Sequence, residues 1–109
     1  MTESLPATAV VRVAILNFDP SLYAEVDALA MKQAEYLIPA IKALPGLIRW
    51  YAAVSPDGSM ANVSIWDSEE HAAQMDQLKE MAVVARGEML ALGGTWTGSI
   101  VNYPIGWTI

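Results

Sequence analysis

LIRWYAAVSPDGSMANVSIWDSEEH, residues 47–71, decides the fold of this chain. Two runs rich in β-branched and aromatic residues, 47–54 and 60–66, flank the tetrapeptide Ser-Pro-Asp-Gly. Such runs favour β-strands, and the tetrapeptide favours a tight turn, so the stretch predicts an antiparallel hairpin. The segment Asp-Ser-Glu-Glu that follows offers a cap and early acids, which indicates a helix directly after the hairpin.

A strand and a helix are predicted before the hairpin. Residues 10–18 (VVRVAILNF) alternate between two sets that are both mostly apolar, so we expect both faces of this strand to be covered. Asp19 and Pro20 suit the first turn of a helix. Its apolar stripe extends over residues 22–44. Pro39 falls inside the stripe and predicts a kink or a division of this helix.

The last third of the chain predicts a second helix and a fourth strand. Apolar residues recur from Met75 to Met89 before Gly93 and Gly94 end the helix, and a strand is expected from Trp96 to Tyr103.

The resulting order, β-α-β-β-α-β, is the ferredoxin-like pattern of an α+β protein, with two helices on one face of a four-stranded antiparallel sheet. We expect a single domain over residues 1–109, with residues 1–8 as a loose arm and residues 104–109 as an apolar tail.

The composition predicts a second copy of the chain as a partner. Hydrophobic residues make up 54% of the sequence and charged residues 17%, against about 45–50% and about 25% in an average soluble domain. A small domain has too much surface to hide this excess alone. We therefore expect a homodimer, a dimeric α/β barrel in which the bare sheet face is covered by a second sheet or by an exchanged tail.

Several partners and sites are disfavoured by the composition. The net charge is −6 and the six basic residues are scattered, so nucleic-acid binding is not expected. With no cysteine and one histidine, too few ligands exist for a metal site. No apolar run approaches the roughly 18 residues that span a bilayer, and the first residues do not resemble a secretory signal. These observations predict a cytoplasmic protein without membrane contact.

The third strand carries polar residues on one of its two faces. Asn62, Ser64 and Trp66 alternate with the apolar set Ala61, Val63 and Ile65. A buried amide without a partner costs about 1–3 kcal/mol, so Asn62 suits a cavity better than a dimer interface without water. We expect the apolar set to pack under the helices, and the polar set to line a pocket on the opposite face together with Asn17.

The block PGLIRWYAAVSPDGSMANVSIWDSEEHAAQM, residues 45–75, resembles the antibiotic biosynthesis monooxygenase family. The shared features are Pro-Gly before the second strand, a glycine in the turn, and Trp-x-Ser-Glu at the passage from strand to helix. The resemblance implies a cofactor-independent monooxygenase that oxidises a phenolic, hydroquinone or polyketide-type aromatic molecule with O₂ and needs no metal or flavin.

The same resemblance implies a set of catalytic residues. A subset of the family has an Asn four residues before the Trp and an Arg in or after the second helix, which match Asn62, Trp66 and Arg86 here. This chain departs from that subset at Ala72, where the subset has Tyr, and at Ala53, where it has His.

Each candidate has an expected role in that chemistry. The Asn62 amide donates to the phenolate or carbonyl oxygen, Trp66 donates its indole N–H or stacks on the ring, and Arg86 supplies positive charge. His71 is the candidate base, because histidine is the side chain that most readily takes up and releases a proton near neutral pH. The candidate substrate contacts are Asn17, Ser64 and Tyr51.

Other interpretations of these residues stay open. Trp66 also fits a packing role, and Arg86 and His71 also fit solvated positions on a helix. A haem-degrading barrel would use His71 as the haem ligand. A barrel that binds, isomerises or cyclises a small aromatic ligand would need no oxygen, and an interaction module would have no cavity at all.

Overall fold

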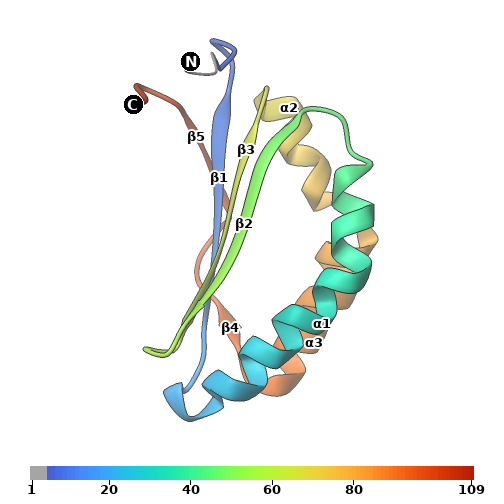
Figure 1. Cartoon of the computed structure of the whole chain (residues 1–109), viewed down its shortest axis with the longest axis vertical. Coiled ribbons are helices and arrows are strands. Elements are labelled where there is room, and N and C mark those ends of the chain that lie inside the picture. Colours follow the sequence, from blue (N-terminus) through green and yellow to red (C-terminus); the bar gives the residue numbers. More distant parts are fainter. Residues whose placement is uncertain (1–4) are drawn as a thin grey trace.

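The computed structural model describes residues 5–109 and has the expected α+β architecture (Figure 1). Helices α1, α2 and α3 all lie on one side of an antiparallel sheet, and the other side of the sheet is bare (Figure 1). In chain order the elements are β1 (Val10–Asn17), the 3-10 turn η1 (Pro20–Leu22), α1 (Tyr23–Lys42), β2 (Leu47–Ser55), β3 (Ser59–Trp66), α2 (Glu69–Ala72), the 3-10 turn η2 (Ala73–Asp76), the π-helix η3 (Glu80–Ala85), α3 (Arg86–Leu92), β4 (Thr95–Trp96) and β5 (Val101–Pro104).

The predicted hairpin is confirmed as β2 and β3. The two strands pair antiparallel, with Val54 opposite Met60. At the turn, the Gly58 N–H donates to the carbonyl oxygen of Ser55 over 3.1 Å. Gly58 has a φ of +103°, which glycine adopts at no steric cost. Strand β3 also pairs with β1, so β1 and β3 form the centre of the sheet.

The predicted fourth strand is two short strands on the same edge of β1. Strand β4 pairs with the end of β1, and β5 pairs with its beginning. Between them, Gly98 has a φ of +53°, a backbone conformation that interrupts a strand. The expected continuous strand over residues 96–103 is therefore wrong at its centre.

The predicted second helix is divided into four short segments, α2, η2, η3 and α3. The main break follows Asp76, whose carboxylate forms an ion pair with Arg12 of β1 over 2.6 Å. This contact joins residues 64 positions apart, so the local apolar periodicity did not reveal it. Val83 and Val84 in η3 add to the irregularity, because β-branched residues are weak helix formers.

The first helix follows the prediction at its start and is not divided at Pro39. The Asp19 carboxylate accepts a hydrogen bond from the Ser21 N–H over 2.9 Å, and this bond lowers the pKa of Asp19. Helix α1 then continues from Tyr23 to Lys42 with Pro39 inside it. Of the two alternatives predicted for Pro39, the division is therefore wrong, and the kink stays a prediction. Within residues 5–109 no helix has the length and apolar character required to cross a membrane.

The C-terminal end of the chain lies near the start of β1 (Figure 1). Of the arm predicted over residues 1–8, the first four residues lie outside the described part. The Thr8 hydroxyl is tied to the carbonyl oxygen of Asp67 over 2.7 Å. The tail begins with a hydrogen bond from the Ile105 N–H to Ala9, and the side chains of Trp107 and Ile109 are exposed.

The core consists of two separate apolar clusters along the helix-facing side of the sheet. The first cluster surrounds Trp66 and includes Val10, and the second surrounds Leu16 and Met60. The cross-strand pairs arrange this side of the sheet in four rows, which are Leu47–Trp66–Val10, Trp50–Ser64–Arg12, Ala52–Asn62–Ala14 and Val54–Met60–Leu16. The third row lies between the two clusters and belongs to neither.

The expected orientation of β3 is wrong. Asn62, Ser64 and Trp66 are buried and face the helices, whereas the alternate set from Ala61 to Ile65 is half-buried and faces the bare side. Alternation separates the two faces of a strand but does not say which one meets the helices. Trp66 determines which face of β3 meets the helices, because burial of this large side chain stabilises the first cluster.

Gly46 provides a test of this packing. Its φ is +88°, and a Cβ at this position would overlap the ring of His71 and the carboxylate of Asp67. We expect Gly46→Ala to lower the free energy of unfolding by about 2 kcal/mol or more, through backbone strain and overpacking. Urea denaturation measures this loss.

Gly87 is the matched control for Gly46. It lies in α3, and a Cβ there would meet no atom within 4 Å. Gly87→Ala should raise the stability by about 0.5–1 kcal/mol, as expected in a helix interior. Equal stability of Gly46→Ala and the unmodified protein would contradict the described packing around residue 46.

Candidate functional site

A cavity of about 490 Å³ lies between α1 and the sheet. This volume is within the range of about 300–1,000 Å³ that is common for small-molecule sites. We call it the large cavity. Its walls are mostly apolar and include Ala34, Leu37, Ile38 and Ile41 from α1, Trp50, Ala52 and Met60 from the sheet, and Met81 and Ala85 from η3.

A second, small cavity of about 120 Å³ adjoins the large one. Its own lining includes Arg12, Ala14, Asp76, Arg86 and Ile100. The residues that line both cavities are Trp50, Asn62, Met81 and Trp96. Asn62 therefore lies where an apolar space meets a charged one.

The cavities exist because the row through Asn62 is narrow. Asn62 pairs with Ala14 on one side and with Ala52 on the other. Each alanine ends at Cβ, so neither fills the space between the sheet and the helices. The side chain of Asn62 is buried, and none of the hydrogen bonds found within residues 5–109 involves its carboxamide. A ligand in either cavity can reach this amide.

Trp96 adds a second free donor to the same wall. Its indole N–H is buried and has no hydrogen-bond partner within residues 5–109. The guanidinium carbon of Arg86 lies 5.4 Å from the centre of the Trp96 ring, which is within the range of a cation–π interaction. No local pattern in the sequence predicts this role for Trp96.

Two guanidinium groups make the small cavity positive. Arg12 is buried, and its side chain donates to Asp76 over 2.6 Å and to the Asn102 side chain over 3.3 Å. No ion pair within residues 5–109 joins Arg86 to a carboxylate. Two cations and one carboxylate therefore surround this space, which favours an anionic occupant.

A polar clamp holds α1 against η3 and α3 beside the large cavity. The buried Gln33 donates its side-chain N–H to the carbonyl oxygen of Ala85 over 3.1 Å and to Glu88 over 3.2 Å. The Tyr36 hydroxyl donates to the same Glu88 carboxylate over 2.6 Å. Burial, followed by the hydrogen bond and the charge of Glu88, raises the pKa of Tyr36 above its ordinary range.

Titration of Tyr36 tests the clamp. Because its folded-state pKa is raised, the stabilisation from this bond is present below the ordinary tyrosine pKa of about 10 and is lost as the pH rises through the higher value. Tyrosinate absorbance should show one late-ionising phenol that Tyr36→Phe removes. Glu88→Gln should shift that ionisation to lower pH, and an unchanged titration curve in Glu88→Gln would contradict the clamp.

Five of the seven sequence-predicted site residues line neither cavity. Trp66 donates its indole N–H to the Ser64 hydroxyl over 2.9 Å, and both side chains are buried at the first cluster's end of the sheet. Neither residue lines a cavity, so substrate contacts by Trp66 and Ser64 have no support here. Asn17 and Tyr51 project from the opposite face of the sheet, because they are an odd number of residues from Ala14 and Ala52.

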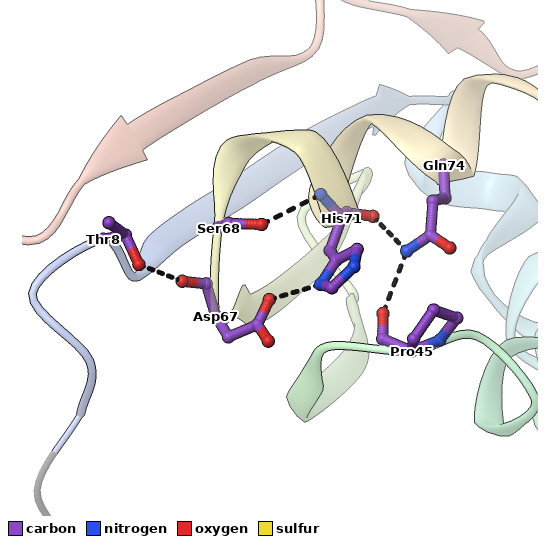
Figure 2. A network of polar contacts seen from close by, with 6 residues as sticks. All are labelled: Thr8, Pro45, Asp67, Ser68, His71 and Gln74. Carbon is purple, nitrogen blue, oxygen red and sulfur yellow. Dashed lines mark hydrogen bonds and ion pairs between the residues drawn. The ribbon is translucent and has the colours of Figure 1, made fainter.

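His71 belongs to a network at the start of α2 (Figure 2). Its Nδ1 lies 2.6 Å from the Asp67 carboxylate, its backbone N–H donates to the Ser68 hydroxyl, and its carbonyl oxygen accepts from Gln74. His71 lines neither cavity. This position explains the residue as part of the helix start and leaves the predicted base and the haem alternative without support.

The structure also shows where Ala72 and Ala53 lie, the two residues that depart from the family pattern. Ala72 is fully buried in the first cluster. Ala53 faces the bare side of the sheet, and the neighbouring Ala52 is the residue that lines the large cavity. Within residues 5–109, no group of three or more His, Cys, Asp or Glu side chains is placed to hold a metal ion.

Solved structures of similar shape come from several organisms. SnoaB from Streptomyces nogalater, a cofactor-independent oxygenase, superposes with a TM-score of 0.62 at 17% identity, over 94% of this chain and 98% of that one. The monooxygenase ActVA-Orf6 of Streptomyces coelicolor, in complex with nanaomycin D, gives a TM-score of 0.68 at 20% identity, over 94% and 92%. A candidate antibiotic biosynthesis monooxygenase from Deinococcus radiodurans gives 0.69 at 16%, over 92% and 95%.

The chain has the fold of the antibiotic biosynthesis monooxygenases. No protein-family model matches the sequence, and no curated protein matches it either. At 16–20% identity the likeness establishes the ferredoxin-like fold and not the reaction. The chemistry has to be argued from the two cavities.

Proposed function

We propose that this protein is a cofactor-independent monooxygenase of the antibiotic biosynthesis family that oxidises a phenolic or hydroquinone-type aromatic substrate with O₂. The observation that carries the proposal is the buried carboxamide of Asn62, which has no hydrogen-bond partner within residues 5–109 at the boundary of the two cavities. The shared fold with SnoaB and ActVA-Orf6 supports the same conclusion.

The apolar walls of the large cavity suit an aromatic ring system. Leu37 and Ile41 from α1 face Trp50 from β2 across this space. A ring held there can place an oxygen atom beside Asn62 and Trp96. Both residues offer N–H donors, and Arg86 adds positive charge nearby. These groups stabilise the ionised form of a phenol more than its neutral form.

The ionised substrate supplies the electrons for the reaction. In an anthrone, the anion transfers one electron to O₂, the two radicals combine to a peroxide, and loss of water leaves a carbonyl in place of the CH₂ group. One oxygen atom enters the product, and the other leaves as water with the two hydrogens of the CH₂ group. The protein binds and orients the anion and excludes bulk water from it.

Asn62→Ala tests the assignment. Oxygen uptake with a panel of anthrones and hydroquinones should fall by about 100-fold or more in kcat, the usual effect of removing one donor to a developing oxyanion. Asn17→Ala is the matched control, because Asn17 lies on the opposite face of the sheet. Turnover that survives Asn62→Ala, or that both variants lose equally, would contradict the proposed site.

A binding or isomerising protein is the second candidate. Within the described chain the cavity linings contain no histidine, and their one carboxylate, Asp76, is paired with Arg12. The site therefore lacks an evident general base, which a protein that only binds an anion does not need. Product formation under strict anaerobiosis distinguishes this candidate from the oxygenase, which forms no product without O₂.

We also propose that the protein is a homodimer through the bare face of the sheet. This face carries apolar rows formed by Tyr51–Val63–Val13–Val101 and Ile65–Val11–Tyr103, and Arg49 pairs with Ile65 at the edge of the second row. Tyr51 and Tyr103 are more than half exposed. A continuous apolar surface of this kind is unusual on a monomer. The predicted cytoplasmic location stays a prediction from the sequence.

Val63→Glu tests the dimer. A carboxylate at the centre of the bare face should prevent the two sheets from meeting, so the variant should sediment as a monomer while the unmodified protein sediments as a dimer. Val83→Glu is the control, since Val83 is exposed in η3 on the other side of the molecule. A monomeric unmodified protein, or a dimeric Val63→Glu, would contradict this interface.

A further inference from the structure

We infer that the ligand of this protein is an aromatic carboxylate, whose rings occupy the large cavity and whose carboxylate occupies the small cavity between Arg12 and Arg86. The inference rests on the proposed function in taking the two cavities as the substrate site, and it adds the charge and the orientation of the substrate. It depends on where the charged side chains lie, how they are paired, and how the two spaces differ in size.

The distribution of charge over the chain identifies the sign of the ligand. The chain has twelve acidic and six basic residues. Arg12 and Arg86 line the small cavity and Lys42 lines the large one. Arg49 pairs with Ile65 on the bare face, so its side chain projects away from both cavities. Asp76 is the one acidic residue among the lining residues of the described chain. An acidic protein that gathers its cations around one space attracts an anion to that space.

The pairing of Arg12 leaves positive charge in the small cavity. The Arg12 side chain is 7% exposed, whereas that of its partner Asp76 is 58% exposed. Asp76 also lines the small cavity, so its carboxylate neutralises one of the two guanidinium charges there. With no ion pair to Arg86 within residues 5–109, one cationic charge remains uncompensated there.

The donors around the small cavity match a carboxylate. Arg12 and Arg86 are guanidinium groups, which bind carboxylates in a planar, two-pronged geometry. Asn62 and the indole N–H of Trp96 line the same space, and this N–H has no partner within residues 5–109. A carboxylate in the small cavity accepts from the two guanidinium groups. Asn62 and Trp96 also line the large cavity, so their N–H groups remain available to the oxygen on the ring.

The sizes of the two cavities determine the orientation of the ligand. A space of about 120 Å³ is smaller than the cavity of about 150 Å³ known to hold benzene. The small cavity therefore accepts a substituent and not a fused ring system. The large cavity, at about 490 Å³, accepts two or more fused rings among apolar side chains. A bicyclic or tricyclic acid fits this division.

The test compares two ligands that differ in charge and hardly in shape. The binding of 2-naphthoate and of 2-naphthamide is measured by calorimetry under nitrogen, so that no oxidation takes place. We expect 2-naphthoate to bind at least about tenfold more tightly, because hydrogen bonds to charged groups are the stronger ones. Arg12→Met and Arg86→Met should each remove most of this preference and leave the affinity for 2-naphthamide unchanged.

Lys79→Met is the matched control, since Lys79 is exposed and does not line either cavity. It removes the same charge and should leave the carboxylate preference intact. If Arg12→Met does not fold, Arg12→Lys and Arg86→Met decide the question. Arg86 forms no ion pair within residues 5–109, and its loss should spare the fold.

Three results would overturn the inference. These are equal affinity for the two ligands, a preference that survives in both arginine variants, and failure of both ligands to bind. None of them depends on turnover. Binding of 2-naphthoate as expected, without O₂ consumption on any phenol, would support the anion site and contradict the proposed oxygenase. O₂ consumption on a phenol, without a preference for 2-naphthoate, would support the oxygenase and contradict the anion site.

Discussion

The organisation of the site depends on one narrow row of the sheet, in which Asn62 lies between Ala14 and Ala52. On either side of this row the sheet and the helices are in contact through large side chains, around Trp66 in one cluster and around Leu16 in the other. At the row itself the alanines are too short to meet the helices. The two cavities follow from this single difference in side-chain size.

Polar groups in the cavity wall determine which ligands the space between the sheet and the helices can bind. A buried indole N–H without a partner costs about 1–3 kcal/mol, so Trp96 lowers the stability of the empty protein. The two apolar clusters and the Gln33–Glu88 clamp stabilise the helices over the sheet and offset this cost. A ligand that accepts hydrogen bonds from these groups regains this free energy on binding. The site is thus preorganised for an oxygen-bearing ligand, and the arginines favour one with negative charge.

Local patterns in the sequence predicted the elements well and their mutual orientation poorly. The hairpin, the Asp19 cap and the helix start at Ser68 depend on neighbouring residues, and all three are confirmed. The face of β3 that meets the helices, the ion pair between Arg12 and Asp76, and the free N–H of Trp96 depend on residues far apart in the chain. Asn62 was found from the residue chemistry together with the family resemblance, and Arg86 from the resemblance alone, whereas Arg12 and Trp96 carried no local signal.

The most direct test of this account is the behaviour of the indole and amide N–H signals in a ¹⁵N-labelled sample during titration with an aromatic ligand such as 2-naphthamide. The Trp96 N–H is free and lies on the cavity wall, whereas the Trp66 N–H already donates to Ser64. The account predicts large shifts for the Trp96 indole and the Asn62 amide, with the Trp66 indole hardly affected. Shifts of the Trp66 indole with those of Asn62 and Trp96 unchanged would place the ligand elsewhere and contradict the account.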